Sequence, residues 1–140
     1  MKVYFCLKAK ASTTTYNSAM PRFVILEHDY PQRHWDFMLE TGSVLRTWRL
    51  AEPPRAGGAI AAAATFDHRP QYLDYEGPVS GGRGKVIRWD AGAFTWQEQA
   101  SDRVIVFLQG MRVLGQVTLR SSSGSDWSFC LDNAKEDSCR

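Results

Sequence analysis

Two histidines and one aspartate in this chain, His28, His34 and Asp36, follow the spacing H-x5-H-x-D. The segment around them, residues 27–40 (EHDYPQRHWDFMLE), has the bulky and aromatic content of a β-strand. Side chains of a strand alternate between its two faces, so His34 and Asp36 share one face. Pro31 cannot donate a hydrogen bond to a sheet and suits a turn that returns His28 to the same place. Two imidazoles and a carboxylate that meet at one point predict a metal site.

The same alternation predicts that Trp35 and Phe37 are buried on the opposite face of the strand. The third histidine of the chain, His68, lies far along the sequence. A single histidine is more often structural than functional, so the functional interpretation of His68 depends on the other two. Glu27 and Glu40 are expected to be solvated strand ends or groups that orient an imidazole.

Composition limits the class of protein. A chain of 140 residues with 44% hydrophobic content predicts one domain around one core. The net charge is only +2, so any contact with nucleic acid must come from a local basic face. The odd number of cysteines, Cys6, Cys130 and Cys139, argues against a disulfide framework and favours a reducing, cytoplasmic compartment. The apolar run at residues 3–7 is too short for a signal peptide, and we expect no membrane span.

The folded unit is predicted to occupy residues 20–132. Residues 9–19 are small and polar without periodicity, so residues 1–19 are expected to form a disordered leader. The charged residues 133–140 are expected to form a frayed tail.

Short strands separated by turn residues are predicted along the whole folded unit, without a convincing amphipathic helix. After the segment that carries the histidines, they cover residues 44–50, 59–66, 85–90, 93–97, 103–109, 110–120 and 127–131. Residues 59–66 are ambiguous because their alanine run also favours a helix. This spacing predicts an all-β fold, a small antiparallel β-barrel or a sandwich, and we expect the site in the polar lumen of a barrel.

Several common catalytic motifs are missing. The chain has no P-loop, no G-x-S-x-G, no C-x-x-C and no H-E-x-x-H. Nucleotide hydrolases of the Walker type, serine hydrolases, zinc ribbons and zincins are therefore not indicated. The aromatic residues could stack nucleobases, but in an all-β domain most of them are expected in the core.

Further motifs occur in a fixed order along the chain. They are RFVILEH, then the histidine and aspartate spacing followed by LE, then DHRPQYLDYEG, the glycine-rich loop before GKVIRWDAG, and the closing VTLR and WSF. Together they resemble the 3′-phosphoesterase domain of bacterial DNA ligase D, also found as a stand-alone protein. The resemblance runs from about residue 22 to residue 132. It implies a small β-barrel that uses manganese to remove 3′-phosphates and 3′-terminal ribonucleotides from primer ends.

The resemblance also implies roles for individual residues. The metal ligands of the family fall on His28, His34 and Asp36, and its phosphate-contacting residues fall on His68 and Tyr72. The implied partners are the 3′ end of DNA or RNA and a ligase or polymerase of a repair system.

Three positions depart from the pattern of the family. Its glutamine, arginine and lysine are replaced here by Leu26, Met38 and Glu52, which removes polar and cationic contacts with the substrate. Because phosphoryl transfer depends on charge stabilisation, we expect slower catalysis, and Met38→Arg with Glu52→Lys is expected to raise the rate. Four arginines are candidates for a replacement charge: Arg33, Arg46, Arg69 and Arg83.

The leading hypothesis is thus a manganese-dependent phosphoesterase that processes 3′ ends in DNA repair. One alternative is a catalytically weakened nucleic-acid-binding module of the same fold, which Met38 and Glu52 favour most. The other is a non-haem iron oxygenase that uses His34, Asp36 and His68 as its two-histidine, one-carboxylate triad. That alternative leaves His28 without a role.

Overall fold

The computed structural model describes residues 20–133, so the predicted leader at residues 1–19 and residues 134–140 of the predicted tail lie outside it. The described part is built from strands and one short 3-10 helix, and none of its helices is long and apolar enough to cross a bilayer. The elements are β1 (Arg22–His28), β2 (His34–Thr41), β3 (Val44–Leu50), β4 (Ile60–His68), η2 (Pro70–Leu73), β5 (Gly77–Pro78), β6 (Lys85–Gln99), β7 (Arg103–Gly110), β8 (Leu114–Ser123) and β9 (Asp126–Asn133). The predicted all-β fold is confirmed.

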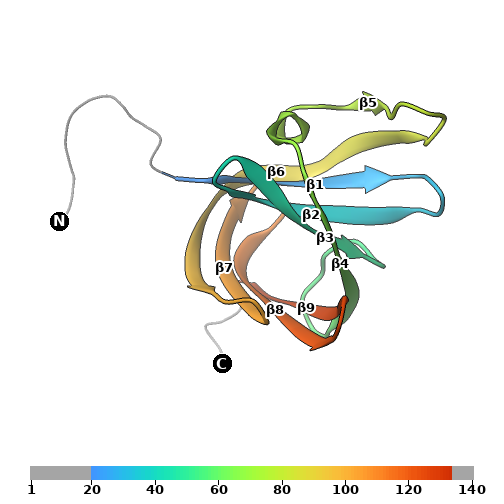
Figure 1. Ribbon diagram of the computed structural model, residues 1–140. Coiled ribbons are helices and arrows are strands. Elements are labelled where there is room, and N and C mark those ends of the chain that lie inside the picture. The colour runs from blue at the N-terminus through green and yellow to red at the C-terminus, as the bar shows by residue number, and fades with distance from the viewer. Residues whose placement is uncertain (1–19, 134–140) are drawn as a thin grey trace, which may run out of the picture.

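The strands close into an antiparallel barrel (Figure 1). The order is β1-β2-β3-β4-β9-β8-β7-β6, and the pairing of β1 with β6 completes the ring. Short β5 pairs with β6 outside the ring. In Figure 1, η2 and β5 lie together over one side of the barrel, next to β6 and β1. The predicted barrel is therefore confirmed, and one side of it carries an additional layer.

Two turns set the register of the first three strands. Gly42, with φ of +64°, and Ser43 form the turn between β2 and β3, which places Asp36 opposite Arg49. The turn at residues 29–33 joins β1 to β2 and places the two ends of the hairpin opposite each other.

The lumen of the barrel is apolar and not polar as expected. All eight strands of the ring contribute to one buried cluster, which includes Phe23, Ile25, Phe37, Leu39, Trp48, Leu50, Ile60, Phe94, Val106, Val117 and Phe129. Phe37 is fully buried there, as predicted, and Trp35 is half-buried against the same cluster. Because Phe37 faces the lumen, its neighbours Asp36 and Met38 face outward. The site therefore lies on the outer surface of the barrel wall.

A second, smaller cluster covers this outer face. Outward side chains of the barrel wall pack there against Leu73, the buried residue of η2. The wall contributes Val24, Leu26, Met38, Leu45 and Val86. An ion pair between Arg22 Nη2 and Asp74 Oδ1, 2.6 Å apart, ties the end of η2 to β1. The burial of Leu73 and this ion pair hold η2 over β1 and β2.

The prediction of two separate strands at residues 85–90 and 93–97 is wrong, because β6 runs through residues 90–92 as one strand of 15 residues. The side chain of Asp90 is buried and accepts hydrogen bonds from four backbone N–H groups. The donors are Ala91, Met111, Arg112 and Val113. Gly92 allows a close approach of β7, because a Cβ there would collide with the carbonyl of Gln109. Asp90 therefore stabilises a turn that is distant in sequence, between β7 and β8.

We expect Asp90→Ala to lower the free energy of unfolding by at least about 3 kcal/mol, because it leaves buried N–H groups without acceptors. Urea denaturation followed by tryptophan fluorescence measures this loss. The matched control is Asp132→Ala, which removes an exposed carboxylate and should change the free energy by less than about 0.5 kcal/mol. Equal effects of the two substitutions would contradict the role of Asp90.

Candidate metal centre

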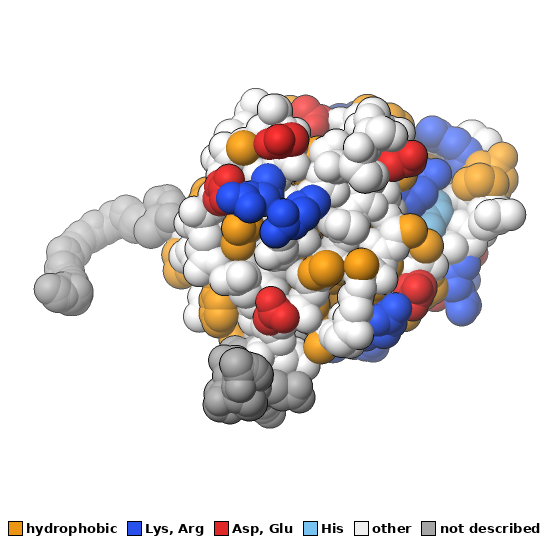
Figure 2. Space-filling view, turned by 90° about the horizontal axis from the view of Figure 1, so that it is seen from below, with side chains coloured by type: hydrophobic (Ala, Val, Ile, Leu, Met, Phe, Trp, Pro, Cys, Tyr) orange, Lys and Arg blue, Asp and Glu red, His pale blue; other side chains and the backbone are white. Residues whose placement is uncertain are grey.

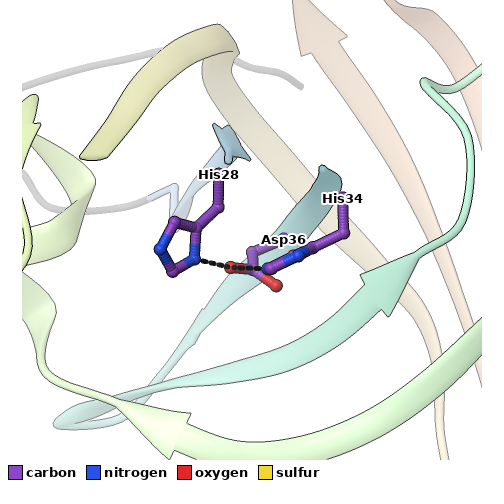
Figure 3. A group of neighbouring side chains, drawn as sticks. All are labelled: His28, His34 and Asp36. Carbon is purple, nitrogen blue, oxygen red and sulfur yellow. Dashed lines mark ion pairs between the residues drawn. The ribbon is translucent and has the colours of Figure 1, made fainter. Parts of the chain in front are cut away.

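His28, His34 and Asp36 converge on the outer face of the β1–β2 hairpin. His28 ends β1 and lies opposite His34, which begins β2. His34 Nε2 is 3.3 Å and His28 Nδ1 is 3.8 Å from Asp36 Oδ2. One potential ligand atom from each residue lies within 4.8 Å of the others, and Figure 3 shows the two rings turned toward the carboxylate. The structure thus brings together the three residues that the spacing singles out.

Two backbone carbonyls fix the tautomers of these histidines. His28 Nε2 lies 2.8 Å from the carbonyl oxygen of Arg83, and His34 Nδ1 lies 2.8 Å from that of Gln32. A carbonyl oxygen can only accept, so each of these nitrogens carries a proton and donates it. In the neutral tautomer that this selects, the other nitrogen of each ring presents a lone pair toward Asp36. Such a second hydrogen bond is the usual way to orient an imidazole toward a metal.

With both rings in this neutral tautomer, the two imidazole nitrogens and the carboxylate are all hydrogen-bond acceptors, and no donor lies between them. Among the described residues, His34 Nε2 and Asp36 Oδ1 are buried without a hydrogen-bond partner. Lone pairs directed at a carboxylate repel it unless a cation lies between them, and buried polar atoms without partners are rare. Two neutral imidazoles and one carboxylate also form a common donor set for divalent transition metals. The three residues therefore fit a divalent cation.

The grouping bears on the oxygenase alternative. That hypothesis requires His68 together with His34 and Asp36, whereas the structure groups these two with His28. Within residues 20–133, His68 lies outside the group of ligand atoms.

A pocket of about 360 Å³ is lined by two of the three residues, His28 and Asp36, and also by His68 and Tyr72. His68 Nδ1 lies 3.1 Å from the carbonyl oxygen of Phe66 and 3.0 Å from Thr47 Oγ1, so Nδ1 carries the proton and Nε2 remains for a ligand. The ring of Tyr72 stands edge-on to that of His68, with centroids 5.7 Å apart. Burial lowers the pKa of His68, and the charge of Asp36 opposes this only in part. His68 is therefore uncharged at neutral pH.

The three departures from the motif pattern have different positions. Leu26 and Met38 are fully buried and line the pocket, so they give it an apolar floor. Glu52 does not line the pocket and is held by Arg55, with 3.0 Å between Oε1 and Nε. The charge reversal at Glu52 therefore does not act inside the pocket.

Only two of the four candidate arginines line the pocket. Arg69 and Arg83 line the pocket. Arg33 instead pairs with Glu27 at 3.0 Å, and Arg46 lies over the rings of two tryptophans of the core. Figure 2 shows Lys and Arg side chains on both sides of a histidine at the molecular surface. Among the residues that line the pocket, Arg69 and Arg83 thus bring positive charge to the site, although the net charge of the chain is small.

Two contributions to the site were missed by the sequence interpretation. Arg49 lines the pocket, and its Nε lies 3.8 Å from Asp36 Oδ1. A signal for Arg49 existed, because a two-residue turn at Gly42 and Ser43 places residue 49 opposite residue 36. The carbonyls of Gln32 and Arg83 had no such signal, since every residue type carries one.

Comparison with known proteins gives consistent results. The sequence model of the family described as "DNA Ligase D 3'-phosphoesterase domain" matches residues 26–121. The multifunctional non-homologous end joining DNA repair protein LigD of Mycobacterium tuberculosis (strain H37Rv) is 35% identical over 124 residues, which cover 81% of this chain and 16% of that protein. The LigD protein of Pseudomonas aeruginosa is 33% identical over 84 residues, or 56% of this chain and 10% of that protein. The chain thus spans only a small part of these relatives.

We expect Mn²⁺ to bind the protein, and His34→Ala to weaken this binding by at least roughly 100-fold because one ligand nitrogen is lost. Isothermal titration calorimetry of the metal-free protein measures the affinity. Glu27→Gln is the matched control, since Glu27 is next to His28 in sequence but pairs with Arg33. Undiminished Mn²⁺ affinity of His34→Ala would rule out the proposed ligand set.

The lowered pKa of His68 is testable in the metal-free protein. We expect the imidazole to titrate below its usual value of about 6.5, because burial favours the neutral form. The ring of Phe66 stacks on that of His68 with centroids 4.8 Å apart, so Phe66→Ala should expose the imidazole and raise its pKa. NMR titration of the ring protons measures both values. A midpoint at or above 6.5 in the parent would contradict the effect of burial.

Proposed function

This chain belongs to the DNA ligase D 3′-phosphoesterase domain family, and on that basis we propose that it hydrolyses phosphate esters at the 3′ ends of DNA or RNA. The observation that supports this most is the convergence of His28, His34 and Asp36 beside a pocket lined by His68 and Tyr72. The proposed substrates are ends that carry a 3′-phosphate or a 3′-ribonucleotide. A ligase or polymerase of DNA repair is the proposed partner.

In this proposal His28, His34 and Asp36 hold Mn²⁺ or another divalent ion. A divalent ion at this place supplies Lewis-acid polarisation of the phosphoryl group. The chain prepares the place by orienting both imidazoles through hydrogen bonds to the carbonyls of Arg83 and Gln32, so that the other nitrogen of each ring faces Asp36. Asp36 contributes the single negative charge, so the ligand set leaves positive charge for an anionic substrate.

His68 and Tyr72 are proposed to bind the phosphoryl group in the pocket. The hydrogen bonds of His68 Nδ1 to Phe66 and Thr47 fix the ring, and its Nε2 becomes a donor to the phosphoryl group when the ring takes up a second proton. The Tyr72 hydroxyl is a donor that needs no such proton, and η2 holds it beside the pocket because Leu73 is buried. Groups that are fixed before the substrate arrives reduce the cost of positioning the phosphate.

The apolar floor of the pocket is expected to make the reaction slow. Leu26 and Met38 offer neither charge nor hydrogen bonds to a transition state that gains negative charge. Removing one such stabilising group costs about 3 kcal/mol, or about a hundredfold in rate. A nucleic-acid-binding module without catalysis is the second candidate, and this floor is the observation that favours it.

We expect the purified protein to shorten or dephosphorylate a labelled primer that ends in a 3′-phosphate or a 3′-ribonucleotide. The reaction should require Mn²⁺, stop with EDTA, and fall below detection in His28→Ala because the ion is no longer held. Gel electrophoresis of the primer measures the rate, and Glu27→Gln should remain active.

Two other outcomes have clear meanings. Activity that persists in both EDTA and His28→Ala would show that it comes from another site or a contaminant. Primer binding without any hydrolysis would contradict the proposed enzyme and support the nucleic-acid-binding module.

A further inference from the structure

Arg49 lines the same pocket as Met38. Met38 lies opposite Thr47 across the β2–β3 pair, and Arg49 is the next residue of β3 on the same outer face, opposite Asp36. Diagonal neighbours of this kind have Cα atoms about 7 to 8 Å apart, which an arginine side chain easily spans. Arg49 and Met38 line the same pocket, and an arginine at position 49 is long enough to reach the space beside Met38 from the neighbouring strand.

We propose that Arg49 forms a phosphate-binding subsite beside Asp36 and supplies the positive charge that Met38 cannot. This inference rests on the proposed function, since it names the group that would contact the phosphoryl oxygens of the same substrate. The ligand class is a terminal phosphate monoester or diester on a nucleic-acid end.

The position of Arg49 suits this role. Its Nε lies 3.8 Å from Asp36 Oδ1, while the two imidazoles lie near the other oxygen, Oδ2. The guanidinium group and the two imidazoles therefore approach different oxygens of the same carboxylate. At 3.8 Å the contact is an ion pair but too long for a hydrogen bond. The N–H donors of Arg49 are consequently not consumed by Asp36.

The other arginines of the pocket are less suitable. Arg83 donates from Nε to the carbonyl of Ser80 at 2.7 Å and from Nη2 to the hydroxyl of Ser80 at 3.2 Å. Arg69 is exposed before η2, and Asp36 has no ion pair with it. The side chain of Arg49 is 45% exposed, so it can turn toward a ligand, and a guanidinium binds phosphate through two parallel hydrogen bonds.

A purely structural role makes a different prediction. If Arg49 only offsets the charge of Asp36, its removal should alter the Mn²⁺ affinity or the thermal stability and leave phosphate recognition unchanged. If it binds phosphate, recognition of a phosphorylated end should be lost while Mn²⁺ affinity stays within about threefold.

The experiment compares two fluorescent oligonucleotides in the presence of Mn²⁺, one ending in a non-hydrolysable 3′-phosphonate and one in a 3′-hydroxyl. Fluorescence anisotropy should show that the parent prefers the phosphonate end by at least about tenfold, and that Arg49→Ala and Arg49→Gln lose this preference. Arg49→Lys should keep part of it, because the charge remains but the two parallel hydrogen bonds do not. On a cleavable primer, Arg49→Ala should be about 100-fold slower than the parent.

A second-site variant tests the compensation directly. Adding Met38→Arg to Arg49→Ala should raise the rate at least about tenfold above that of Arg49→Ala alone, provided that circular dichroism shows a folded barrel. If the double variant does not fold, the subsite is tested by the phosphonate preference of Arg49→Gln alone. Retention of the preference by Arg49→Gln would overturn the subsite. A parent that prefers the phosphonate end but does not hydrolyse the primer would refute the proposed activity and leave the subsite standing.

Discussion

The alternation of side chains along β2 is the constraint on which both core and site depend. Phe37 fills the lumen of the barrel, and its neighbours Asp36 and Met38 consequently face the outer pocket. A shift of one residue in the pairing of β2 would exchange these roles and bury a carboxylate among aromatic rings, which is energetically prohibitive. The apolar lumen therefore fixes which residues are available for chemistry. The two adjoining turns then bring His28 and Arg49 to the same face from the neighbouring strands.

The electrostatics of the site are local. Two lone pairs and a carboxylate meet where the surrounding barrel wall is apolar, so their need for a cation is stronger than at an exposed surface. Arginines stand around the pocket, while its floor is formed by Leu26 and Met38. The positive charge thus acts from the sides of the pocket, which suits an anionic group that enters from solvent.

Much of this arrangement could be predicted from residues close in sequence. The spacing of His28, His34 and Asp36 fixes their common face, because a strand and one short turn determine it. The polarity of the lumen could not be predicted in this way, since it depends on which faces of eight strands are apolar together. The role of Asp90 was also hidden, because its partners are the N–H groups of a turn about 20 residues away. Every residue except proline has a backbone N–H group, so the residue types do not reveal which of these groups will be partners.

The two hydrophobic clusters of the protein are separate, and this separation matters for redesign. Leu26 and Met38 pack in the small outer cluster under η2 and not in the cluster that holds the barrel closed. The floor of the pocket can therefore be exchanged together with Leu73, its covering residue, while the interior that determines folding is left intact. Laboratory evolution directed at this layer would explore new ligand chemistries on an unchanged scaffold.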